Sequence, residues 1–262
     1  MMKRFRTASA AMTIAVYTCA EALRNRIAWL AGLVLLTGFF VTQFLGSVAI
    51  TETAPFQAAF MGAFLRLAMV VLLAILVVTG TLREFHDKGV ELVLSLALPR
   101  WAYLVGKLGG FVAIGVALAL GCTLLLMLHS PWQQCVVWGL SLVFELSIVS
   151  TFSMLCLLSF NQVTAALSAV GAFYVSARTI AALQLMAHGP VVDAPSVAQQ
   201  FIEGFVSVLA YLLPDLSLFG MSHWLAHASA SWSSLWPIAL QSLIYVSLLG
   251  AASMFDLYRK EF

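Results

Sequence analysis

The chain has 262 residues, of which 62% are hydrophobic and only 9% are charged, and its formal net charge is +2. Soluble proteins average about 45–50% apolar and about 25% charged residues, so this composition excludes a water-soluble globular fold. A bilayer core needs roughly 20 apolar residues per spanning helix, so the chain can hold about six spans. We therefore expect an all-α membrane protein with a single transmembrane domain over residues 1–262.

The first predicted element is a basic, weakly apolar segment that ends near residue 26. Its centre is rich in Thr, Ser and Ala, whereas a cleaved secretory signal would have a more apolar centre. Met12, Val16 and Leu23 recur at helical spacing. We predict an amphipathic N-terminal helix that lies at the membrane surface.

Six segments that follow are long and apolar enough to cross a bilayer. They cover residues 27–47, 62–82, 104–128, 136–158, 163–187 and 235–255. Only residues 159–162 separate the fourth and fifth spans, so these two spans should be antiparallel neighbours.

The connections between spans differ in charge. Basic residues gather before the first span, between the second and third, and after the sixth: Lys3, Arg4, Arg6, Arg24, Arg26, Arg83, Lys88, Arg100, Lys107, Arg259 and Lys260. The other connections carry the acidic residues Glu52, Asp193, Glu203 and Asp215. Positive charge favours the cytoplasmic side, so we predict a multi-pass protein of the inner (cytoplasmic) membrane with both termini in the cytoplasm.

Residues 188–234, between the fifth and sixth spans, are too many for a plain turn. Their middle, residues 198–213, is apolar but shorter than a span, which indicates a re-entrant or interfacial helix. Trp224, Trp232 and Trp236 suit the outer headgroup layer. A surface cap that merely closes the external face is an equal alternative.

The connection between the second and third spans is the most informative part of the chain. It is charged at its start and apolar in its middle, and Pro99 blocks further helix. We predict a short helix over residues 84–98 that lies across the membrane face and presents charges to a soluble partner. The charged residues of this segment are Glu84, Lys88, Glu91 and Arg100.

The pattern of this connection resembles a known family. Glu is followed by Lys-Gly-x-Glu-x-x-Leu-Ser and then by Arg-aromatic-x-x-x-x-Gly-Lys, as in the coupling-helix region of the type-2 ABC exporter permeases. The family usually has Leu-Ser-x-Pro-x-Ser-Arg, whereas this chain has Ala97 at the proline and Pro99 at the serine. The nearest members are six-span permeases, of which the nitrous oxide reductase maturation transporter is one.

The resemblance implies a complex of two membrane subunits, as a homodimer or a related heterodimer, with two copies of a separate ABC ATPase. The helix over residues 84–98 would sit in a groove of the ATPase, with Glu84, Lys88, Glu91 and Arg100 at the contact. This chain has no GxxxxGK[ST] phosphate loop, so we expect no ATPase activity and no bound cofactor on it. ATP and Mg would bind the partner subunit. Nothing in the sequence indicates nucleic-acid binding, and the transported substrate is not readable.

Two ionisable residues lie well inside predicted spans, Glu145 in the fourth and Arg178 in the fifth. Each is about nine residues from the outer end of its helix, or roughly 13 Å deep. Charges at that depth need a partner or water, so we predict an ion pair that locks the two spans, or charges that line a transport path. Arg66, near the outer end of the second span, could compete for Glu145 or extend to the surface.

Small residues recur in the third span, where they permit close helix approach. They are Gly106, Gly110, Ala113, Gly115 and Ala117, and they form either a subunit contact or an ordinary contact within the chain. His223 and His227 are four residues apart, a spacing that suits a metal, but no third ligand is evident and we expect no metal site.

Two other functions compete with transport. A non-transporting membrane anchor or assembly scaffold would have the same spans but no need of a coupling loop. An intramembrane enzyme would need catalytic residues at one depth, and the predicted spans contain no His and, apart from Asp256 at the inner edge, no Asp.

Overall fold

A computed structural model describes residues 2–24, 26–48, 53–86, 99–188, 197–221, 223–226 and 231–259. Nearly all of this part of the chain is helical. The α-helices are α1 (Met2–Arg24), α2 (Arg26–Val48), α3 (Thr53–His86), α5 (Arg100–Leu126), α6 (Trp132–Phe160), α7 (Val163–His188), α8 (Val197–Leu212), α9 (His223–Ala226) and α10 (Leu235–Arg259). The short 3-10 helices η1 (Leu218–Gly220) and η2 (Trp232–Ser234) lie in the segment before α10.

Six of the described helices, α2, α3, α5, α6, α7 and α10, are long and apolar enough to cross a membrane. The predicted all-α membrane fold with six spans is therefore confirmed. The helix α3 has 34 residues, which correspond to about 51 Å. Because a bilayer core is only about 30 Å thick, α3 must extend beyond it at one end or both.

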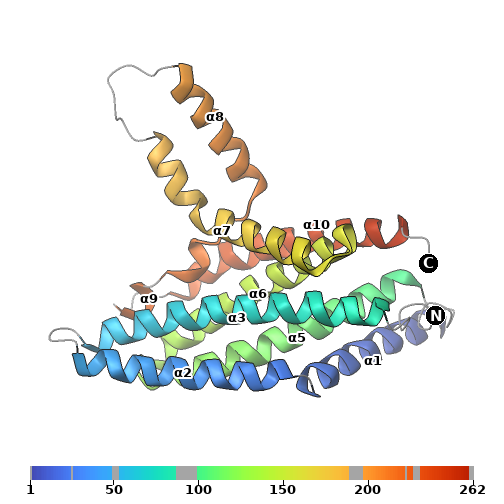
Figure 1. The fold of residues 1–262 in the computed structure, drawn as a ribbon, viewed down its shortest axis with the longest axis horizontal. Helices are drawn as coiled ribbons and strands as arrows, with labels where there is room; N and C mark the ends of the chain where they lie inside the picture. The colour runs from blue at the N-terminus through green and yellow to red at the C-terminus, as the bar shows by residue number, and fades with distance from the viewer. Residues whose placement is uncertain are drawn as a thin grey trace.

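The six long helices form one elongated bundle (Figure 1). The helices α3 and α6 form its centre. Within the most apolar stretch of each of these helices 67% of the residues are buried, whereas the figure is 17% for α2 and α10. Leu65 and Leu73 of α3 and Leu142 and Leu146 of α6 belong to the central core. The start of α1 and the end of α10 lie at one end of the bundle, together with the end of α3 and the start of α5.

The turn between α6 and α7 is as tight as its length suggests. Asn161 caps α6 in the left-handed conformation, with φ of 55°, and its N–H donates to Leu157 O at 3.0 Å. Asparagine is among the few non-glycine residues that adopt this conformation readily. The chain therefore reverses within a few residues, and α6 and α7 are packed neighbours as predicted.

The N-terminal helix α1 packs closely on α5. A Cβ on Gly106 would lie 2.6 Å from Ala11 O, and a Cβ on Gly110 would lie 2.6 Å from Thr18 Cβ. These two positions admit only glycine without a shift of α1. Of the two predicted roles for the small residues of the third span, Gly106 and Gly110 therefore serve a contact within the chain.

The segment before the last span contains α8, a helix that is apolar but shorter than a span. Together with the adjoining end of α7, it projects away from the axis of the bundle (Figure 1). Its apolar side chains Phe201 and Tyr211 are exposed. The predicted short apolar helix between the fifth and sixth spans is thus present.

Candidate functional site

Three charged side chains meet inside the bundle and form what we term the Glu145 cluster: Arg66 of α3, Glu145 of α6 and Arg178 of α7. The Arg66 guanidinium forms an ion pair with Glu145 Oε2, and both side chains are buried, at 2% and 0% exposure. Arg178 Nη1 lies 3.6 Å from Glu145 Oε1. One carboxylate thus serves two guanidinium groups.

Neutral groups complete the surroundings of the Arg66–Glu145 ion pair. Tyr174 Oη donates to Glu145 Oε1 at 2.9 Å. Arg66 Nη2 donates to Ser141 Oγ at 2.9 Å and to Trp138 O at 3.3 Å, and the guanidinium carbon lies 4.7 Å from the centre of the Trp138 ring. A buried ion pair is favourable only when its remaining donors and acceptors are satisfied, and these contacts supply most of that requirement.

Arg178 extends the Glu145 cluster toward the segment that precedes α10. Its Nη1 donates to Leu216 O at 3.0 Å and its Nη2 donates to Gly220 O at 3.3 Å. Its side chain is 30% exposed, so it is the one partly open member of the cluster. Arg178 therefore holds residues 216–220 against α7 in addition to its contact with Glu145.

The structure changes the predicted pairing in one respect. Glu145 and Arg178 do come together, but the closer partner of Glu145 is Arg66. The sequence named Arg66 only as a competitor, because it cannot show that the second span lies against the fourth. The contact between α3 and α6 supplies that information.

A second group, which we term the Lys107 cluster, consists of Lys107 of α5, Glu84 of α3 and Glu21 of α1. Lys107 Nζ donates to Glu84 Oε1 and lies 3.8 Å from Glu21 Oε2. Tyr103 Oη donates to Glu84 Oε2 at 2.8 Å. The lysine is buried, but Glu84 and Glu21 are 28% and 45% exposed. This cluster joins three helices and remains open to solvent on its carboxylate side.

The surroundings of Glu21 shift the titration of its carboxyl group. Partial burial raises its pKa above the ordinary value of 4.5. The positive charge of Lys107 lowers the pKa, whereas the negative charge of Glu84 raises it, and the net result is a raised value. Glu21 is therefore the member of the Lys107 cluster that lies outside the spans and takes up a proton more readily than a free glutamate.

The sequence predicts that a separate helix starts at Glu84, and this prediction is wrong. Glu84 and its neighbours up to His86 continue α3, because no residue in that stretch breaks the helix. The Glu84 side chain therefore binds Lys107 and Tyr103 of α5 instead of presenting a free charge to a partner protein. Lys88 and Glu91 lie outside the described residues, as does the rest of the predicted helix from residue 87 to residue 98.

Arg100, the first residue of α5, contacts the end of α10. Its Nη1 donates to Leu257 O at 3.0 Å and to Tyr258 O at 3.2 Å. Carbonyl groups at a helix C-terminus carry partial negative charge, so a guanidinium there stabilises the helix end. Sequence reasoning missed this contact because the two residues are separated by more than 150 positions.

Among the described residues, no group of three His, Cys, Asp or Glu side chains is placed to hold a metal ion. His227 lies outside the described residues. No protein-family model matches the chain, and no curated protein matches it in sequence. A function must therefore be argued from the arrangement of this chain's own residues.

Proposed function

We propose that this chain is the membrane-spanning permease subunit of an ATP-binding cassette exporter and works with a separate ATPase. The six spans, the charge asymmetry of their connections and the coupling-like pattern between α3 and α5 support this proposal. The missing phosphate loop requires that ATP and Mg bind the partner. As in the family that the chain resembles, two permease subunits and two ATPase subunits would form the complex.

One observation carries the proposal: both ends of the proposed coupling loop are fixed to the bundle. Glu84, just before the loop, binds Lys107 and Tyr103 of α5, while Arg100, just after it, binds the end of α10. A force on residues 87–98 would therefore reach α3, α5 and α10 together. A loop that only set topology would need no such attachment.

This arrangement divides the predicted coupling residues into two groups. Lys88 and Glu91 remain the candidates for direct contact with the ATPase. Glu84 and Arg100 are assigned instead to the attachment of the loop, because their side chains bind other parts of this chain.

The proposal is tested with the full chain and a candidate ABC ATPase subunit that has no membrane spans of its own. The Lys88→Ala/Glu91→Ala variant should reach normal levels in the membrane but lose co-purification of the ATPase or the stimulation of ATP hydrolysis in lipid vesicles. Arg259→Ala, which removes an exposed basic residue at the end of α10, serves as the control and should retain both.

Three results would overturn the proposal. ATP hydrolysis by the isolated chain would mean that the motor is not a separate subunit. Unchanged association and stimulation in the Lys88→Ala/Glu91→Ala variant would remove the role of the loop. Stable association without any stimulation, even for the unaltered chain, would favour the alternative of a membrane anchor or assembly scaffold.

The proposed orientation places both termini and Lys88 in the cytoplasm and residues 188–234 outside the inner membrane. In a variant whose four native cysteines are replaced, a membrane-impermeant thiol reagent should modify Asp193→Cys in intact cells. It should leave Lys88→Cys unmodified until the cells are opened. Labelling of Lys88→Cys alone would reverse the orientation.

A further inference from the structure

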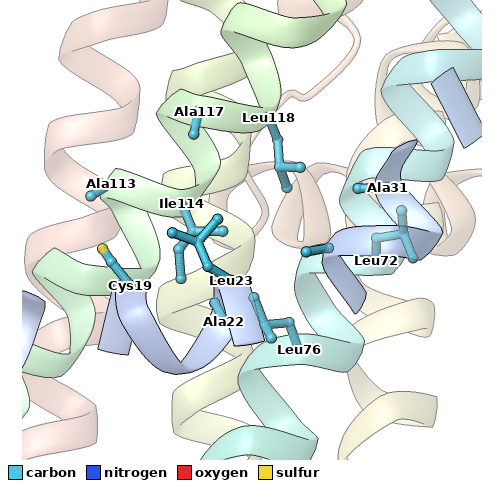
Figure 2. A pocket seen from close by; sticks show the side chains of 11 residues that line it. Cys19, Ala22, Leu23, Ala31, Leu72, Leu76, Ala113, Ile114, Ala117 and Leu118 are labelled. Atoms are coloured by element: carbon cyan, nitrogen blue, oxygen red, sulfur yellow. The ribbon is translucent and has the colours of Figure 1, made fainter. Parts of the chain in front are cut away.

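An apolar cavity of about 260 Å³ opens between α1, α2, α3 and α5, beside the junction of α1 and α2 (Figure 2). Small side chains create this space: Ala31 comes from α2, and Ala113 and Ala117 come from α5. Larger apolar residues such as Leu72 and Leu76 of α3 line the remaining wall. The cavity is therefore an apolar recess.

The lining of the cavity spans the junction of α1 and α2. Its lining runs from Leu76 to Leu72 on α3 and from Ala113 to Leu118 on α5, and these two helices run in opposite directions. Five residues of helix correspond to about 7 Å. Cys19 and Ala22 of α1 line the recess on the side toward the end of the bundle that holds both termini, and Ala28 and Ala31 of α2 line it on the other side of the junction.

The size and chemistry of the recess suit a hydrocarbon chain. An apolar cavity of about 150 Å³ stays dry and binds benzene. A cavity of about 260 Å³ has room for a longer apolar group, such as part of an acyl chain. Because three of the four surrounding helices, α2, α3 and α5, are long and apolar enough to cross a membrane, the lipid of the bilayer is the apolar ligand at hand.

Two basic residues lie beside this recess. Arg24 directly follows Leu23, which lines the cavity, and Arg26 precedes Ala28, which also lines it. Both arginines are exposed, and no ion pair joins either one to another described residue. Because the apolar part of α2 follows Arg26, a bilayer that covers this span would place the two guanidinium groups near the level of the lipid phosphates.

We propose that this recess binds one acyl chain of an anionic phospholipid whose headgroup is held by Arg24 and Arg26. The acyl chain fills the space left by Ala31, Ala113 and Ala117, and the negative headgroup neutralises the two exposed guanidinium groups. The bound lipid would contact all four helices around the junction of α1 and α2. This inference rests on the membrane fold and does not depend on the proposed transport function.

The test measures the thermal unfolding of the purified full chain in detergent, titrated with phosphatidylglycerol or with phosphatidylcholine. A ligand that binds the folded state raises the unfolding midpoint with its concentration, which gives an apparent affinity. We expect phosphatidylglycerol to bind about tenfold more tightly than phosphatidylcholine, since each basic residue near the surface favours an anionic lipid. The Arg24→Gln/Arg26→Gln variant should lose this preference, and the control Arg259→Gln should keep it.

A second set of variants tests the acyl-chain site. Ala117→Leu fills the recess and should weaken the binding of both lipids about tenfold while the preference for phosphatidylglycerol remains. Ala113→Leu is a second filling variant, should Ala117→Leu fail to fold. The control Ala251→Leu, on an exposed position of α10, should bind both lipids as the unaltered chain does.

The proposal is wrong if the arginine double variant still prefers phosphatidylglycerol, or if the filled variants bind both lipids normally. Inorganic phosphate is the remaining probe. If phosphate alone raises the midpoint as much as phosphatidylglycerol does, the arginines bind an anion without an acyl chain, and the lipid site is excluded.

Discussion

The Glu145 cluster and the Lys107 cluster share the helix α3, where Arg66 and Glu84 are separated by about 27 Å, but they are built in opposite ways. The first surrounds one buried carboxylate with two guanidinium groups. The second surrounds one buried ammonium group with two carboxylates that are partly open to solvent. The comparison teaches that this bundle can hold a buried charge in two ways, and that only the second leaves the carboxylates open to solvent.

The two clusters also join different helices. The Glu145 cluster connects α3, α6 and α7, and Arg178 adds the segment before α10. The Lys107 cluster connects α1, α3 and α5 next to the proposed coupling loop. We therefore expect the Glu145 cluster to hold its helices in fixed positions. We expect the Lys107 cluster to let its helices move relative to one another near the site where an ATPase would bind.

The largest expected effect is that of Glu145→Gln. This change leaves the buried guanidinium of Arg66 without its counter-charge, which should destabilise the protein by about 3–5 kcal/mol. Arg178→Gln should cost much less, because Arg178 is partly exposed and Glu145 keeps Arg66. The measurement is the free energy of unfolding in detergent.

A double variant sharpens this prediction. Arg66→Met with Glu145→Leu removes the two buried charges and should recover much of the stability that Glu145→Gln loses, since the remaining Arg178 is partly exposed and keeps its hydrogen bonds to Leu216 O and Gly220 O. If Glu145→Gln has the same free energy of unfolding as the unaltered chain, the Glu145 cluster does not stabilise the bundle.

Glu84→Gln should have the next largest effect. It removes the charge that faces the buried Lys107 ammonium, and hydrogen bonds to charged groups contribute about 1.5–3 kcal/mol. Tyr103→Phe is the control, because it removes one neutral donor to Glu84 and keeps the ion pair. An equal loss in both variants, measured as free energy of unfolding, would mean that the charge of Glu84 is unimportant.

Glycine substitutions test whether α1 must lie close to α5 for the Lys107 cluster to form. Gly106→Ala and Gly110→Ala place a methyl group against the α1 backbone and Thr18, which should cost about 1–3 kcal/mol. Gly109→Ala is the matched control: its Cβ would meet nothing within 4 Å, and alanine favours a helix. Thermal unfolding and protease cleavage of α1 should separate the first two variants from the third.

The smallest expected effect is the pH dependence that Glu21 gives the Lys107 cluster. The folded protein holds a proton on Glu21 more tightly than the unfolded chain does, because its pKa is raised. The resulting stability is present in full below about pH 4.5 and is lost as the pH rises through the raised pKa of the folded state. Glu21→Gln should remove this slope from the unfolding midpoint above about pH 4.5, whereas an unchanged slope would assign it to another group.

The sequence by itself determined the number and type of the spans, the tight turn at Asn161 and the apolar helix before the last span. These features depend on the local run of residues: about 20 apolar residues require a helix in the bilayer, and a few residues between two such helices require a reversal. The membrane fold was predictable for that reason, and the intramembrane position of Glu145 and Arg178 followed from it.

Only the tertiary structure decided which side chains act together. Arg66 is the closest partner of Glu145, Glu84 binds Lys107, and Arg100 binds the end of α10. The recess beside Arg24 likewise exists only because alanines on different helices face one another. The sequence states the charge and size of each side chain. The distance between two side chains depends instead on which helices are neighbours and on how each helix is rotated. Packing across the whole bundle fixes the neighbours and the rotations.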